Sequence, residues 1–317
     1  MALDAHAGRL LAMVAAAGRG DSARSDLAER RQRFASLMRL SGAAEPVDAV
    51  EDRLVPGAEG LLGLRLYTPP AAGPGLGPGL VYFHGGGFFA GTLDTHDALC
   101  RILANSARCR IAAVDYRLAP EHKFPAAIMD CYRAARWVRE HAEILGIDPS
   151  RLAVGGDSAG ATLAAIVCQM ARDAQEPSFA FQLLLCPITD FTGSLESRRT
   201  LATGYLLDRV TMAQELAFYL PPGIDAGNPR VSPLNASDLS RLPPAQIHTA
   251  EFDPLRDEGG AYAARLEAAG GDVRYTCHPG MIHLFYAMAG VIPYARIALK
   301  GIGAELEAAL APPRRLV

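Results

Sequence analysis

The residues best suited to do chemistry surround Ser158, in the sequence Gly156-Asp157-Ser158-Ala159-Gly160. An apolar run precedes this stretch and small residues follow it, which predicts a strand, a tight turn and a helix. A serine at such a turn adopts strained dihedrals that lift its Oγ above the sheet. Glycines two residues before and after it remove Cβ atoms that would clash. The pattern G-x-S-x-G is typical of a nucleophile elbow, although alone it also occurs in glycine-rich loops.

A second stretch, His84-Gly85-Gly86-Gly87, directly follows another short apolar run. Three successive glycines expose backbone N–H groups in the way that an oxyanion hole requires. We expect Gly85, Gly86 and Gly87, with the N–H of Ala159, to form that hole, and the sequence leaves open which glycines donate. The alternatives are a flexible turn and a phosphate-binding loop, but no lysine follows at the spacing of a P-loop.

An acid and a base follow the serine in the chain. Asp253 ends a late apolar run, and His283 lies in a loop that a glycine begins. The order Ser158, Asp253, His283 is the order of the catalytic triad in α/β-hydrolases. Asp257, one helical turn further on, is the rival acid, and His278, at the end of the last strand, is the rival base.

The elements that must position these residues alternate between strands and helices. This alternation predicts βαβ units and a parallel sheet, hence an α/β fold. We expect an N-terminal helical cap segment over residues 1–50 and a hydrolase core over residues 51–190 and 229–317. Residues 191–228 interrupt the βα rhythm and are expected to be a second cap segment, the alternative being another packed helix of the core.

Composition excludes several other classes of protein. The 317 residues carry 31 basic and 34 acidic side chains, so the net charge is −3 and no basic excess suggests nucleic-acid binding. No apolar run has the length of a membrane span. The six cysteines form no C-x-x-C pair and no cluster with histidines, which predicts buried thiols, a cytoplasmic location and no metal site. The apolar residues 10–18 follow Arg9 like the core of a signal peptide, but an amphipathic helix is favoured.

Taken together, the motifs resemble those of the bacterial hormone-sensitive-lipase-like esterases, also called family IV. The resemblance covers residues 84 to 283 and rests on six stretches: His84-Gly85-Gly86-Gly87, Asp94-Thr95-His96-Asp97, Asp115-Tyr116-Arg117-Leu118-Ala119-Pro120-Glu121, Gly156-Asp157-Ser158-Ala159-Gly160, Asp253-Pro254-Leu255-Arg256-Asp257-Glu258 and Gly280-Met281-Ile282-His283. It implies an α/β-hydrolase fold with an eight-stranded, mostly parallel sheet and a helical cap. It also implies hydrolysis of carboxylic esters with short or medium acyl chains, without a cofactor.

Two positions depart from the family pattern. Phe88 stands where many members have tryptophan, and Leu284 stands where many have glycine. With Tyr205 of the insertion, these residues are expected to shape the substrate pocket. The resemblance also allows a homodimer through the edge strand, here Val273–Cys277.

Three other functions remain open. A true lipase is disfavoured, because the sequence shows no distinct, strongly apolar lid helix. The same triad could hydrolyse amides or formamides, because one fold hosts many chemistries. Plant gibberellin receptors resemble the family but are non-catalytic binders that have lost the histidine, and the presence of His283 argues against such a role.

Overall fold

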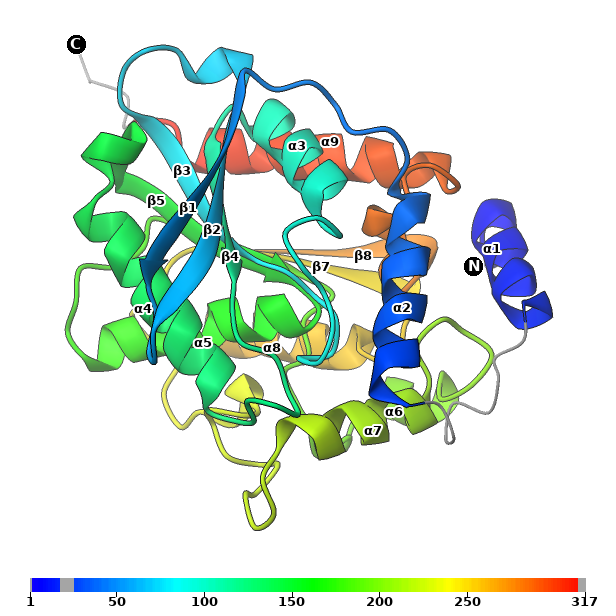
Figure 1. Cartoon of the computed structure of the whole chain (residues 1–317). Coiled ribbons are helices and arrows are strands. Elements are labelled where there is room, and N and C mark those ends of the chain that lie inside the picture. The colour runs from blue at the N-terminus through cyan, green and yellow to red at the C-terminus, as the bar shows by residue number, and fades with distance from the viewer. Residues whose placement is uncertain (1, 18–25, 313–317) are drawn as a thin grey trace.

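The computed structural model describes residues 2–17 and 26–312. Within them, the molecule is built on one eight-stranded sheet (Figure 1). Its strand order is β1-β2-β4-β3-β5-β6-β7-β8. The strands are β1 (Ala49–Pro56), β2 (Leu61–Thr68), β3 (Gly77–Phe83), β4 (Arg110–Asp115), β5 (Ile147–Asp157), β6 (Gln182–Leu185), β7 (Ala245–Phe252) and β8 (Val273–Ile282). Strand β2 is antiparallel to both β1 and β4, and all other neighbours are parallel. The predicted α/β-hydrolase sheet is therefore confirmed.

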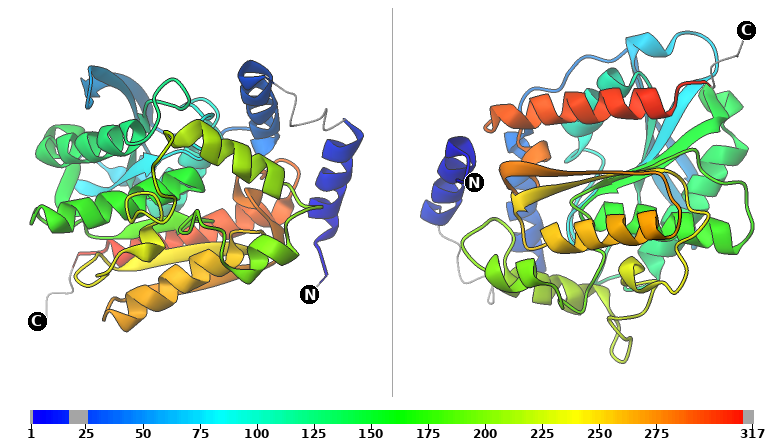
Figure 2. Two further views of the ribbon diagram at one scale, coloured as in Figure 1. Left: turned by 90° about the horizontal axis from the view of Figure 1, so that it is seen from below. Right: turned by 180° about the vertical axis from the view of Figure 1, so that it is seen from behind.

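Helices cover both faces of the sheet, as the central parallel strands require (Figures 1 and 2). Helices α3 (Asp97–Ala107) and α9 (Pro293–Ala309) cover one face, and α4 (Ala126–Glu140), α5 (Ala159–Asp173) and α8 (Arg256–Ala268) cover the other. Helix α5 is rich in alanine and is buried along most of its length. Small side chains let it pack closely against the strand that leads into it.

In the described part of the chain, four further α-helices lie outside these two layers. They are α1 (Ala5–Ala16), α2 (Leu27–Met38), α6 (Glu196–Thr200) and α7 (Arg209–Tyr219). Helix α2 and helix α7 meet on one side of the molecule (Figure 1), where Arg30 donates a hydrogen bond to the side chain of Gln214. Lys123 of the core donates to the carbonyls of Ala217 and Phe218 at the end of α7, at 2.6 and 2.7 Å.

The N-terminal apolar stretch forms a capped helix. The Asp4 side chain accepts hydrogen bonds from the N–H groups of His6 and Ala7, so α1 has an ordinary N-cap. Gly18, the end of the predicted stretch, lies outside the described residues. Within the described ranges, no helix combines the length and the apolar character needed to cross a bilayer.

One strand has no clear signal in the sequence. Residues 49–56 form β1 at the edge of the sheet, where most of its side chains are exposed or only partly buried. Charged residues stand in the middle of the strand, so no apolar alternation marks it. Strand β3 begins at Gly77, within a stretch rich in proline and glycine.

Candidate active site

Ser158 lies at a sharp turn between β5 and α5. Its dihedrals are φ 51° and ψ −118°, a conformation that non-glycine residues rarely adopt. A Cβ atom on Gly160 would overlap the carbonyl oxygen of Phe83, so only glycine fits there. The strand therefore delivers the Ser158 hydroxyl to the carboxyl edge of the sheet, at the N-terminus of α5.

The structure brings Ser158, His283 and Asp253 together. The Ser158 Oγ lies 3.0 Å from Nε2 of His283, and Nδ1 of His283 lies 2.7 Å from an Asp253 carboxylate oxygen. All three side chains are buried. This is the hydrogen-bond chain in which an imidazole can take a proton from a hydroxyl while a carboxylate fixes its tautomer.

Charges around His283 favour its protonated form. Burial alone lowers the pKa of His283, but the Asp253 carboxylate, with smaller effects from Glu215 and Asp157, raises it above the ordinary histidine value. A base of this kind is well suited to accept a proton during the reaction.

One cysteine adjoins this chain of hydrogen bonds. Cys186 offers a sulfur within 4.8 Å of the ligand atoms of Asp253 and His283, so the three could in principle hold a cation. Burial, with the Asp253 charge, raises the pKa of the Cys186 thiol well above its usual value. A protonated thiol is a poor metal ligand, and the other two side chains already bind each other.

The rival residues lie elsewhere. Asp257 accepts a hydrogen bond from the Ser197 N–H at 2.7 Å and pairs with Arg256 at 2.8 Å. His278 contacts His248, with 3.0 Å between Nε2 and Nδ1, and its other ring nitrogen lies 3.0 Å from the Tyr294 hydroxyl. Neither rival belongs to the hydrogen-bond chain.

The glycine loop lies beside Ser158. Its Gly85 N–H donates to Asp157 at 3.0 Å and is thus already used. Gly86 and Gly87 have φ values of 121° and 59°, which favour glycine. In the part of the chain that the structure describes, no hydrogen bond uses the N–H groups of Gly86, Gly87 or Ala159. These three N–H groups are therefore the available donors to an oxyanion.

Asp157 is a buried residue whose structural role the sequence did not reveal. Its carboxylate accepts hydrogen bonds from the Tyr82 hydroxyl at 2.7 Å and from Gly85, and lies 3.4 Å from Nε2 of His96. Burial would raise the pKa of Asp157, but His96 and Tyr82 hold it below the usual range. Asp157 thus fixes the glycine loop to the elbow. The stretch Asp94-Thr95-His96-Asp97 was the sequence feature that could have indicated this role, because its His96 lies beside the Asp157 carboxylate.

A cavity of about 570 Å³ opens onto Ser158 and His283. Its other walls come from α1, α2, α7, the glycine loop and Leu284. Phe88 and Tyr205 are not among its lining residues, so their placement gives no support to the expected pocket role. Phe88 stacks on Tyr219 at a centroid distance of 3.9 Å, and Tyr205 packs on Phe252.

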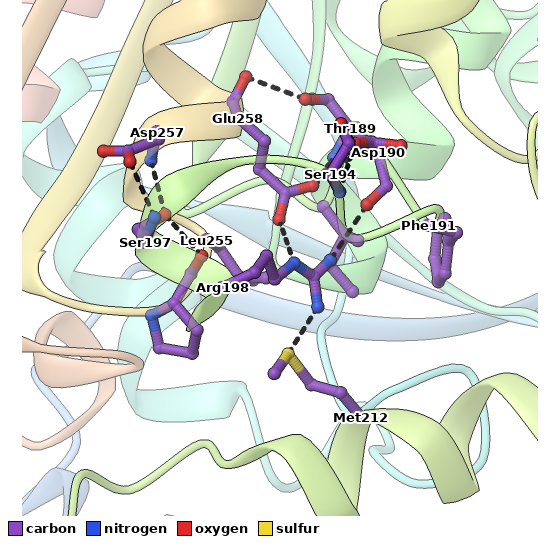
Figure 3. A network of polar contacts seen from close by, with 12 residues as sticks. Thr189, Asp190, Phe191, Ser194, Ser197, Arg198, Met212, Leu255, Asp257 and Glu258 are labelled. Carbon is purple, nitrogen blue, oxygen red and sulfur yellow. Dashed lines mark hydrogen bonds and ion pairs between the residues drawn. The ribbon is translucent and has the colours of Figure 1, made fainter. Parts of the chain in front are cut away.

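The insertion is fixed to the core by a buried polar network (Figure 3). Arg198 of α6 pairs with the Glu258 carboxylate at 2.8 Å, and Glu258 also accepts from the N–H groups of Thr189 and Asp190 at 2.8 and 2.6 Å. Ser197 donates to the carbonyl of Pro254, next to Asp253. The network therefore links the insertion to the segment that carries the triad carboxylate.

Comparisons with known proteins agree with this geometry. A family model described as the alpha/beta hydrolase fold matches residues 80–287. The chain is 46% identical over 252 residues to the carboxylesterase NlhH of Mycobacterium tuberculosis, covering 78% of each protein. It is 41% identical over 269 residues to an ethyl acetate hydrolase of Pseudomonas putida, covering 84% of this chain and 85% of that protein.

A solved structure extends the likeness to nearly the whole chain. The hyperthermophilic esterase of the archaeon Pyrobaculum calidifontis superposes with a TM-score of 0.91 at 40% sequence identity, covering 98% of this chain and 100% of that one. Sequence, fold and relatives thus agree. The chain belongs to the α/β-hydrolase-fold family, as one of its hormone-sensitive-lipase-like carboxylesterases.

Proposed function

We propose that the chain hydrolyses carboxylic esters through an acyl-enzyme, with Ser158 as the nucleophile. His283 takes the hydroxyl proton as Oγ attacks the ester carbonyl, and Asp253 holds the imidazole tautomer and stabilises the imidazolium. The hydrogen-bond chain from Ser158 through His283 to Asp253 is the observation that carries this proposal.

The oxyanion of the tetrahedral intermediate would be stabilised by the N–H groups of Gly86, Gly87 and Ala159. Gly85 contributes indirectly, because its own N–H holds Asp157. His283 then protonates the leaving alcohol, and a water molecule repeats the attack on the acyl-enzyme. Losing one such donor costs on the order of a hundredfold in rate in comparable sites.

We further propose that residues 1–50 and 191–228 act together as the cap. Helix α2 and helix α7 both line the cavity, which supports this division. The cavity volume of about 570 Å³ suits esters of short to medium chain length. The cysteines found free in the structure support a cytoplasmic location.

The test is a series of p-nitrophenyl esters with acyl chains from C2 to C12. We expect wild-type activity to peak at short or medium chains and Ser158→Ala to reduce it roughly a millionfold. The control is Ser150→Ala, which changes an exposed serine bonded to Asp148. Comparable turnover by Ser158→Ala would overturn the mechanism. Activity on matched anilides but not on esters would instead establish an amidase.

A further inference from the structure

A carboxylate from the cap projects into the active-site cavity. Glu215, on α7, lines the same cavity as Ser158 and His283. Its carboxyl group occupies the space beside Gly87, where an added Cβ atom would overlap it. An ionisable side chain is thus placed against the glycine loop that we assign to the oxyanion.

The carboxyl group of Glu215 has no fixed partner. Among the described residues it accepts no hydrogen bond and forms no ion pair, although Arg30, His283, Arg198 and Asp208 act on it electrostatically. Each charged group around it already binds another group: Arg30 binds Gln214, Arg33 binds Glu29, Arg198 binds Glu258, His283 binds Asp253, and Asp208 binds the Thr211 N–H.

We propose that Glu215 is a specificity-determining residue that favours esters carrying a positively charged amine close to the scissile bond. A carboxylate in a cavity wall without a partner is costly, and a cationic group of the substrate would pair with it. A neutral substrate of the same shape gains no such interaction. This inference rests on the proposed esterase function and names a substrate class for it.

The preference should depend on pH. Burial raises the pKa of Glu215 to about 7, against opposing effects of His283 and Arg30. Glu215 is therefore charged well above pH 7 and neutral well below it. His283 titrates as well, but its protonation affects cationic and neutral substrates alike, so the ratio of their kcat/KM values isolates Glu215.

The experiment compares two pairs of esters. The two members of each pair have the same shape and differ only in whether one quaternary atom is a charged nitrogen or a neutral carbon. The charge lies on the alcohol side in 2-(trimethylammonio)ethyl acetate, matched by 3,3-dimethylbutyl acetate. It lies on the acyl side in ethyl 4-(trimethylammonio)butanoate, matched by ethyl 5,5-dimethylhexanoate. We measure kcat/KM at pH 8.5 and pH 6 for wild type, Glu215→Gln and Glu196→Gln. Glu196 is an exposed glutamate of the same insertion, paired with Arg199.

At pH 8.5 we expect the ratio of kcat/KM for the cationic ester to kcat/KM for the neutral ester to fall at least about tenfold in Glu215→Gln, for one of the two pairs. This change is equivalent to about 1.4 kcal/mol. Any change for the neutral ester should be smaller than the change for its cationic partner, Glu196→Gln should match wild type, and the wild-type ratio should fall at pH 6. An unchanged ratio in Glu215→Gln overturns the proposal, as does an equal loss on both members of each pair. Failure of wild type on the neutral esters would contradict the proposed function itself, which is a separate outcome.

Discussion

At the scale of single residues, two aspartates one helical turn apart have different environments. Asp253 contacts His283 at 2.7 Å, whereas Asp257 pairs with Arg256 and Ser197. We therefore predict that Asp253→Asn lowers kcat by about 10,000-fold, because an amide stabilises the wrong imidazole tautomer. Asp257→Asn is the matched control and should keep kcat within a few-fold of wild type. Steady-state kinetics on a p-nitrophenyl ester decides, and an equal loss in both variants would refute the assignment.

The charge of Glu215 also bears on the catalytic base. His283 must be neutral to accept a proton, so activity is lost as pH falls through its pKa. Because nearby carboxylates raise the pKa of His283, we predict an acid limb of kcat/KM with a midpoint above the ordinary value of about 6.5. In Glu215→Gln this midpoint should move to lower pH, since one stabilising negative charge is gone. A pH–rate profile on a neutral ester measures it, and a midpoint unmoved by Glu215→Gln would contradict this electrostatic coupling.

The sequence was informative about the reacting residues and much less so about the pocket. The elbow and the glycine loop are local patterns, because their strained backbones demand glycine at fixed spacings. Pocket walls are set by packing between distant segments. Thus Leu284, with φ of 61°, lines the cavity, while Phe88, also at positive φ, turns toward Tyr219. No spacing rule in the sequence tells that Leu284 lines the cavity and Phe88 does not. Likewise, no pattern around Glu215 indicates that its side chain reaches the cavity.

At the scale of elements, the ion pair between Arg198 and Glu258 decides where the insertion docks (Figure 3). We predict that Arg198→Met lowers the free energy of unfolding by about 3–5 kcal/mol, because it leaves a buried carboxylate without its counter-ion. It should also raise KM, since α6 leads into the cavity wall. Urea unfolding followed by circular dichroism measures the first effect.

The double variant Arg198→Met with Glu258→Gln is the control for that prediction. Removing both charges should recover part of the lost stability, because the uncompensated charge is gone. A single variant within about 1 kcal/mol of wild type would show that the pair does not anchor the insertion.

The central strands were predictable because they carry short, continuous apolar runs. Strand β3 is buried along its whole length and reads as a continuous apolar run near its end. Strand β1 was missed because an edge strand with exposed charges lacks that pattern. Strand β1 pairs with β2 from Ala49 to Pro56, and the periodicity of its own sequence does not reveal this contact.

At the scale of the whole molecule, the two edges of the sheet differ. Strand β1 places Glu51, Asp52 and Arg53 along its edge, which discourages pairing with another sheet. Strand β8, at the opposite edge, exposes the short run Arg274, Tyr275 and Thr276. An open edge with a single charge in this run is a natural site for strand pairing between two copies, so the homodimer expected from the sequence remains a prediction.

Sedimentation velocity across micromolar concentrations tests it. We predict a dimer for wild type and a shift toward monomer in Thr276→Lys, because two added charges face each other across a two-fold axis. Val50→Lys places the same charge on the β1 edge and should leave the dimer intact. A wild-type chain that sediments as a monomer throughout would remove the dimer. Equal dissociation of both variants would contradict an interface at β8, because the added charge would then weaken the dimer wherever it was placed.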